Sequence, residues 1–151
     1  DFELGFGAVE VKTTLSNHGF PAKISSLEQL DDCVRKPIFL AGIRLKNVEE
    51  GKSLTEIAKE ISSVFSEDAE STRIFSDKLL SAGFHESHSH RYSRRFIHNE
   101  TKIMEVVDGF PRLTSGSVPS GIRRAIYEID LDSVEINEIS MPDALNRLGV
   151  L

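Results

Sequence analysis

The sequence lacks the residues and motifs on which several common protein classes depend. Its 151 residues contain one cysteine, Cys33, and no tryptophan, so it has neither a disulfide framework nor a zinc site built from paired cysteines. No apolar run approaches the roughly 18 residues of a membrane-spanning helix. No HExxH, GxSxG or P-loop motif occurs, which leaves zinc proteases, serine hydrolases and P-loop nucleotide hydrolases without support. We therefore expect a soluble, cytoplasmic protein.

Positive charge is also scarce. The chain has 18 basic and 24 acidic residues and a net charge of −6, which argues against a generally basic nucleic-acid coat protein. Basic residues are concentrated locally, in a stretch with Arg91, Arg94 and Arg95 and in the pair Arg123 and Arg124. Because guanidinium groups bind phosphate in a bidentate manner, these stretches are candidate phosphate-binding surfaces. The alternative is a solvated strand face with mixed charges.

Strand patterns dominate the first third of the chain, which is long enough for one domain around a single core. Residues 1–4 and 8–14 flank a glycine-containing turn, and polar and apolar side chains alternate, which predicts a β-hairpin. Residues 38–45 form an apolar run typical of a strand buried on both faces. A helical pattern separates these strands, so we predict an α/β fold.

Capping signals and apolar spacing predict the helices of the first half. Ser25 with Glu28, or Ser26 with Gln29, matches a capping box and predicts a short helix between the strands. Residues 53–82 carry two apolar stripes at helical spacing, which predict a helical hairpin. We expect both stripes to lie in the core.

The last third is predicted to contain further strands and a terminal helix. Residues 91–107 have the pattern of a second hairpin that turns at Asn99 and Glu100, and residues 123–131 the pattern of another strand. Ser140, followed by a proline in the first turn, predicts the start of a C-terminal helix.

The charged side chains of the first hairpin suggest a metal site. Glu10 and Lys12 share one face of their strand, because side chains alternate along it. If paired residue numbers sum to eleven, Asp1 lies opposite Glu10, and if they sum to thirteen, Glu3 does. Two carboxylates at that separation repel each other unless a cation lies between them. We predict an odd sum, since an even sum moves the acids to opposite faces; ordinary charges on a solvated strand are the alternative.

The spacing D-x8-E-x-K, formed by Asp1, Glu10 and Lys12, resembles the motif of the PD-(D/E)XK nucleases. The segments EVKTT and ISSLEQL, the buried strand, the helical hairpin and VVDGFPRLTSGSVPSGIRRAIYEIDL follow in an order similar to one uncharacterised branch of that superfamily. That branch occurs in bacterial restriction-modification and phage-defence loci. The resemblance covers nearly the whole chain.

This resemblance implies a fold, a cofactor and a substrate. The implied fold is a central mixed β-sheet flanked by helices, a restriction-endonuclease-like core with a helical hairpin and a C-terminal β-rich portion. The implied cofactor is Mg²⁺, with Mn²⁺ as an alternative, and the implied partners are DNA, a second copy in a homodimer, or other restriction or defence subunits. Because members of the superfamily usually have further segments ahead of the aspartate, we expect residues 1–151 to be a single domain from the C-terminal part of a longer chain.

The resemblance also assigns roles to residues. Asp1 and Glu10 are metal-binding carboxylates, the Val11 carbonyl is a further oxygen ligand, and Lys12 positions the attacking water. The expected activity is Mg-dependent hydrolysis of DNA phosphodiester bonds, with alanine at Glu10 or Lys12 abolishing cleavage but, on a polar face, barely affecting stability. We expect the DNA backbone to be held by Arg91, Arg94, Arg95, Arg123 and Arg124. The alternatives are a non-catalytic DNA-binding or scaffold module and a protein-interaction subunit that docks through residues 53–82.

Overall fold

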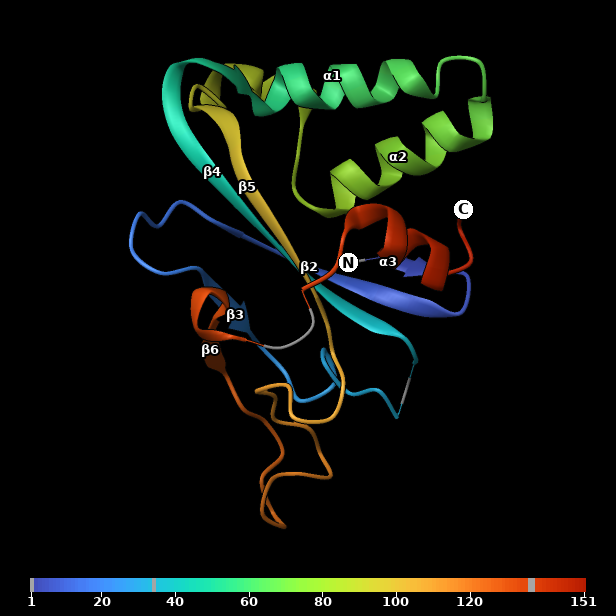
Figure 1. Cartoon of the computed structure of the whole chain (residues 1–151). Helices are drawn as coiled ribbons and strands as arrows, with labels where there is room; N and C mark the ends of the chain where they lie inside the picture. Colours follow the sequence, from blue (N-terminus) through green and yellow to red (C-terminus); the bar gives the residue numbers. More distant parts are fainter. Residues whose placement is uncertain (1, 34, 136–137) are drawn as a thin grey trace. The chain divides into compact units, whose positions relative to one another are not determined.

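The computed structural model of the protein describes residues 2–33, 35–135 and 138–151 (Figure 1). In chain order, its elements are β1 (Phe2–Leu4), β2 (Gly7–Thr14), β3 (Pro21–Ile24), β4 (Ile38–Ser53), α1 (Leu54–Val64), α2 (Ala69–Ser81), the 3₁₀ helix η1 (Glu86–Arg91), β5 (Arg95–Glu105), β6 (Tyr127–Asp130), the 3₁₀ helix η2 (Leu131–Ser133) and α3 (Met141–Arg147). Within these described residues, no helix is long and apolar enough to cross a membrane.

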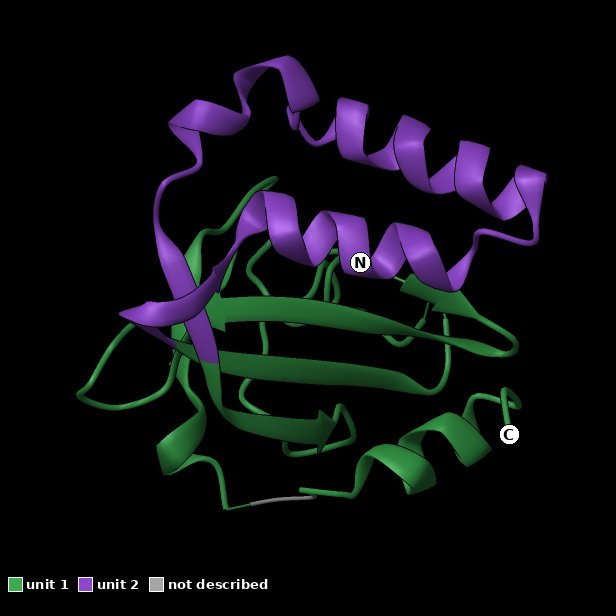
Figure 2. Cartoon of the chain, turned by 90° about the horizontal axis from the view of Figure 1, so that it is seen from above, with its two compact units in different colours: residues 1–45, 98–151 green, residues 46–97 purple. Residues whose placement is uncertain are grey.

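The chain divides into two compact units, which Figure 2 distinguishes by colour. Unit 1 comprises residues 1–45 and 98–151, and unit 2 comprises residues 46–97. Strands β4 and β5 therefore each have one end in unit 1 and the other end in unit 2.

A mixed sheet with strand order β1-β2-β4-β5 forms the centre of the fold. β1 and β2 are antiparallel, whereas β2 and β4 are parallel, with Glu10 beside Leu40 and Lys12 beside Gly42. A separate two-stranded sheet pairs β3 with β6. The predicted α/β class, with a mixed sheet flanked by helices, is confirmed.

The first hairpin has the predicted odd-sum register. Phe2 lies opposite Val9 and Leu4 opposite Gly7, so paired numbers sum to eleven. The turn between the strands contains Gly5, whose φ of 50° lies in the left-handed region that favours glycine. The described part of β1 therefore presents Glu3 on the face of β2 that carries Glu10 and Lys12.

Unit 1 has an apolar core on each face of the sheet. On one face, Leu40 packs with Phe20 and other side chains of the β3–β6 layer. On the other face, Phe39 packs with Ala144 and Leu148 of the α3 region. The prediction of a strand buried on both faces is confirmed for the first half of β4, and the C-terminal helix begins as predicted after the N-cap Ser140.

Unit 2 contains the predicted helical hairpin, but the predicted burial of its apolar stripes is wrong. Ser53 caps α1 in a complete capping box with Glu56. Along α1 and α2 only Ala58 is buried, and Val64 is 78% exposed. Phe65 and Phe75 touch between the helices, with ring centroids 5.8 Å apart. Two helices bury only the side chains along their shared seam, so the outer parts of both stripes stay exposed.

Two predicted elements do not form, and a third is shorter than predicted. Residues 25–33 adopt bends and turns in place of a short helix. β5 runs straight through Asn99 and Glu100, where a turn was predicted; Glu100 lies beside Arg44 of β4, 3.3 Å away, which is consistent with a continuous strand. β6 begins at Tyr127, so Arg123 and Arg124 precede the strand in irregular chain. β3 was not predicted at all.

Candidate functional site

Glu10 is a buried carboxylate with two cationic or polar partners. Its side chain is 8% exposed, and its Oε1 atom lies 2.5 Å from Lys12 Nζ and 2.5 Å from Gln29 Nε2. The expectation that Glu10 and Lys12 lie on a polar face, where replacing them would barely affect stability, is therefore wrong. The reason is that residues 25–33 bring Gln29 onto Glu10, on the face of the sheet that also carries the β3–β6 layer. An ionised carboxylate is tolerable there because Lys12 forms an ion pair with it and Gln29 donates a hydrogen bond to it.

Gln29 is a site residue that the sequence reasoning missed. Ser25 N–H donates to Gln29 Oε1 at 2.7 Å. An N–H group only donates, so the amide oxygen must face Ser25 and the amide NH₂ group must face Glu10. The spacing of Ser25, Ser26, Glu28 and Gln29 was interpreted as a capping box. In the structure the glutamine amide instead links its own loop to Glu10, a contact across 19 positions that local patterns cannot indicate.

The loop that carries Gln29 is anchored on both sides of it. Leu27 and Leu30 are fully buried. Arg112 donates from Nη1 to the Leu30 carbonyl at 2.9 Å, and its Nη2 lies 2.8 Å from Asp32 Oδ1. Because Arg112 is itself mostly buried, this clamp fixes the loop against unit 1 and with it the position of the Gln29 amide.

Lys12 occupies a tightly packed part of unit 1. Its neighbour on β4, Gly42, lies under the β3–β6 layer: a Cβ atom there would come within 2.5 Å of a Leu131 methyl group and 2.8 Å of the Phe20 ring. The Lys12 side chain is 18% exposed, so its ammonium group is close to solvent without being freely solvated. An ammonium group has three N–H donors, so the ion pair with Glu10 does not prevent Lys12 from contacting other acceptors.

The donor set at Glu10 fits a hard divalent cation. Both described partners contact Oε1, and Oε2 accepts no hydrogen bond from any residue that the structure describes. A carboxylate oxygen is a ligand that Mg²⁺ and Mn²⁺ accept, and no soft sulfur or imidazole ligand intervenes. Glu10 can therefore supply one ligand oxygen without losing its bonds to Lys12 and Gln29.

The structure gives a different outcome for each of the other predicted metal ligands. Asp1 lies outside the described residues. The Val11 side chain packs with the apolar cluster on the opposite face of the sheet, and the role of its carbonyl stays a prediction. Glu3, the acid that shares a face with Glu10, bonds instead to Arg35 at 2.6 Å and is largely exposed.

A second acidic group lies near the end of the same loop. Ligand atoms of Asp31, Asp32 and Cys33 lie within 4.8 Å of one another. The hydrogen bond with Asp31, followed by the negative charge of that residue, raises the pKa of the Cys33 thiol. Asp32 is already paired with Arg112. Nothing beyond proximity indicates an ion here.

The predicted DNA-binding arginines fall into two groups. Arg95 is already bonded to other residues of unit 2. Its Nε donates to the Gly51 carbonyl at 2.7 Å, and its Nη2 lies 2.9 Å from Glu56. The remaining four form no ion pair with any residue that the structure describes, and all are exposed: Arg91, Arg94, Arg123 and Arg124. Only these four have guanidinium groups available for phosphate.

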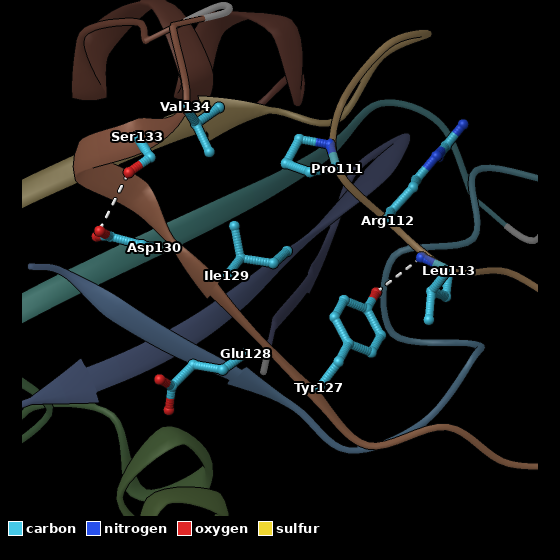
Figure 3. Close-up of a pocket in the computed structure, with 9 residues that line it drawn as sticks. All are labelled: Pro111, Arg112, Leu113, Tyr127, Glu128, Ile129, Asp130, Ser133 and Val134. Carbon is cyan, nitrogen blue, oxygen red and sulfur yellow. Dashed lines mark hydrogen bonds between the residues drawn. The ribbon is translucent and has the colours of Figure 1, made fainter.

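A cavity of about 470 Å³ lies beside β6, away from Glu10 and Lys12, which do not line it (Figure 3). Tyr127 reaches across it, and its hydroxyl accepts a 3.0 Å bond from Leu113 N–H. Burial raises the pKa of this phenol. Asp130 accepts bonds from Phe20 N–H and the Ser133 hydroxyl. The polar groups of the cavity thus mainly hold unit 1 together, and the predicted site lies elsewhere.

Comparison with known families gives one match to the chain. The family described as "Putative PD-(D/E)XK family member, (DUF4420)" matches residues 1–132. No curated protein and no solved structure matches the chain. The matched residues include Glu10, Lys12 and Gln29, and the predicted resemblance to the PD-(D/E)XK superfamily is confirmed.

Proposed function

Because the chain belongs to the PD-(D/E)XK family, we propose that it is a metal-dependent DNA endonuclease domain that acts in a restriction or phage-defence system. One observation carries this proposal: the buried Glu10 carboxylate is held by Lys12 and Gln29 through one oxygen, while the other has no partner within the described residues. The arrangement combines a cation ligand with an adjacent ammonium group, and both can stabilise the charge that develops when a phosphodiester is hydrolysed.

Glu10 would hold the divalent ion, together with Asp1 and the Val11 carbonyl if the assigned ligand set is complete. Bound Mg²⁺ or Mn²⁺ supplies charge neutralisation at the phosphate and a lower pKa for a bound water. Gln29 keeps the Glu10 carboxylate in one orientation, because its own amide is fixed by Ser25. Preorganised ligands of this kind need little rearrangement when the reaction begins.

Lys12 is the proposed catalytic cation. It is paired with Glu10, and its three N–H donors can also serve the attacking water or a phosphate oxygen. Charge accumulates on the phosphate oxygens in the transition state, and an ammonium group in a mostly buried position acts on that charge with less screening than in water. The tight packing beside Gly42 limits how far this side chain can move.

Four unpaired arginines are the proposed backbone contacts. Arg91, Arg94, Arg123 and Arg124 are exposed and free of acidic partners among the described residues, as phosphate binding requires. Arg95, expected in the same role, instead joins the end of β4 to the start of α1 through Gly51 and Glu56. We therefore remove Arg95 from the DNA-binding set.

A plasmid-nicking assay with Mg²⁺ or Mn²⁺ tests the proposal. We expect Glu10→Gln and Lys12→Met to abolish nicking, and Gln29→Ala to lower the rate by about 10- to 100-fold, the effect typical of losing a residue that orients a metal ligand. Glu60→Gln, which removes an exposed acid paired with Lys52, is the matched control and should cut like the wild type. Equal rates for wild type and Lys12→Met would contradict the role of the lysine.

The non-catalytic alternative makes a different prediction for the same assay. A DNA-binding or scaffold module would shift DNA in a gel but would not nick it with either metal. Docking of a defence subunit on the helical hairpin also stays an alternative prediction, and neither alternative requires the buried Glu10–Lys12 pair.

A further inference from the structure

Unit 2 contains a small pocket that combines arginines with aromatic and apolar side chains. It has a volume of about 170 Å³ and is lined by Leu54, Arg91, Tyr92, Arg94 and Phe96. All five residues belong to unit 2. Two of them are arginines without an ion-pair partner in the described chain, and the others present apolar or aromatic surface.

The aromatic wall of this pocket is held in place. Tyr92 stacks on Phe84 with ring centroids 5.0 Å apart, and its hydroxyl contacts the Gly83 carbonyl and His85 N–H. Phe96 follows Arg95, whose guanidinium group is bonded to Gly51 and Glu56. A Cβ atom at Gly51 would lie 2.5 Å from the Phe96 backbone, so the strand approaches closely there. The wall is therefore formed before any ligand arrives.

The charged side chains frame that wall. The Arg94 guanidinium lies over the Phe96 ring, 5.1 Å from its centroid. A stacked guanidinium keeps its N–H edge available for an anion and offers a flat surface to a planar ring. Arg91 ends η1 and is exposed. A ligand that satisfies the whole pocket must therefore combine a flat apolar group with negative charge beside it.

We infer that this pocket binds one unpaired nucleotide of the DNA substrate, with the base against the apolar wall and neighbouring phosphates on Arg91 and Arg94. This inference rests on the proposed function for the choice of DNA. Aromatic side chains beside cations are the usual way in which proteins hold single-stranded bases without reading their sequence. A paired base cannot enter, because its faces are covered by its neighbours in the duplex. An acidic peptide could bind the arginines, but only a peptide with an aromatic side chain would also cover the apolar wall of the pocket.

Anisotropy measurements with the full chain, in EDTA so that no cleavage occurs, test the inference. The probes are a labelled oligothymidylate and an abasic oligonucleotide of the same length, which carry equal charge and differ only in the bases. We expect the oligothymidylate to bind about five- to a hundredfold more tightly, the range for stacking of a base. Equal affinities would overturn the inference, because phosphate contacts alone would then explain binding.

Variants distinguish the contribution of the apolar wall to probe binding from that of the two arginines. Leu54→Ala should weaken oligothymidylate binding several-fold and leave abasic binding unchanged, since it removes only apolar surface. Arg91→Ala and Arg94→Ala should weaken both probes, and each should reduce the salt slope by about 0.7, the value for one phosphate contact to a single strand. Arg73→Ala is the matched control, because Arg73 is in the same unit but is paired with Glu70 and Asp77. An equal loss from Arg73→Ala, or displacement of the probe by a glutamate–tyrosine copolymer at equal charge concentration, would overturn the inference.

The outcome is independent of catalysis. If the wild type binds the oligothymidylate more tightly than the abasic probe but never nicks DNA, the nuclease proposal is wrong and the nucleotide-binding inference is retained. If it nicks DNA but binds both probes equally, the pocket fails and the nuclease proposal stands.

Discussion

Units 1 and 2 are stabilised in different ways. Unit 1 has two apolar clusters, one on each face of the sheet, and fully buried side chains such as Phe39, Leu40 and Leu131. In unit 2, whose residues are all described, only Gly51 and Ala58 are buried. Its helices rely on local interactions, including the capping box at Ser53. A buried carboxylate needs surroundings that hold its partners in place, and only unit 1 offers them.

The ion pairs of the two units show the same contrast. Glu10 and Lys12 in unit 1 are both largely removed from solvent. Lys52 and Glu60 in unit 2 form a bond of similar length, 2.7 Å, but each side chain is more than half exposed. Distance alone therefore does not indicate how much a pair matters; the desolvation of its members does.

The largest expected effect comes from breaking the buried pair. Lys12→Met leaves Glu10 buried with only Gln29 as a partner, and we expect it to lower the free energy of unfolding by about 3–5 kcal/mol. The double variant Lys12→Met with Glu10→Gln removes both charges and should recover most of that loss. Lys52→Met, at the exposed pair, should change stability by less than about 1 kcal/mol. Urea unfolding monitored by circular dichroism measures all three, and similar values for Lys12→Met and Lys52→Met would contradict the contrast.

A second prediction compares the apolar side chains of the two units. Leu131→Ala removes a fully buried side chain of unit 1 and should lower the free energy of unfolding by about 2–5 kcal/mol. Val64→Ala, at the exposed end of α1, should change it by less than about 0.5 kcal/mol. The same urea experiment applies. A large loss from Val64→Ala would show that the outer stripe of the hairpin is covered in solution.

A third prediction concerns the unpaired arginines of unit 1. Replacing both Arg123 and Arg124 by alanine should weaken binding to duplex DNA of any sequence and lower the slope of log K against log salt by about two. The control replaces Arg35 and Arg147, which are paired with acids in the same unit, and removes equal charge. Filter binding over a salt series gives both slopes. Identical salt slopes for the two double variants would show that the DNA does not contact Arg123 and Arg124.

The smallest expected effect is the pH dependence of the α1 N-terminus. The hydrogen bond from the Ser53 backbone, assisted by Arg95, lowers the pKa of Glu56 from 4.5 to about 2. A lowered pKa stabilises the folded helix above pH 4.5, and that contribution is lost as the pH falls from 4.5 towards 2. Glu56→Gln should lack this loss.

Amide hydrogen exchange of α1, compared between wild type and Glu56→Gln at each pH, measures the difference. A difference that stays constant from neutral pH to pH 2 would show that the Glu56 charge does not support the cap.

The features that the sequence predicted correctly are those determined by nearby residues. The hairpin register follows from a short glycine-containing turn, and the starts of α1 and α3 follow from the caps Ser53 and Ser140. The E-x-K spacing identified Glu10 and Lys12 because alternation along one strand brings them together. These features depend on a few consecutive residues, so the pattern alone contains the information.

The features that it missed depend on distant residues. The helix predicted from the capping pattern at Ser25 does not form, because Gln29 is hydrogen-bonded to Ser25 and Glu10 in an irregular loop. The predicted turn at Asn99 is wrong, because β5 continues through this residue alongside β4. The burial of Glu10 could not be predicted from alternation, because residues 25–33 and the β3–β6 layer that surround it come from other parts of the chain.

The way in which Glu10 is held bears on which cation the proposed site would select. While Lys12 and Gln29 both occupy Oε1, the carboxylate offers a single oxygen, so it can act only as a monodentate ligand. Mg²⁺ is commonly bound through single carboxylate oxygens and retained waters, whereas Ca²⁺ takes six to eight oxygens and often draws on both oxygens of a carboxylate. At the proposed site, the two contacts that orient Glu10 would thereby also disfavour the larger ion, and the Gln29 amide would contribute to ion selectivity without touching the ion.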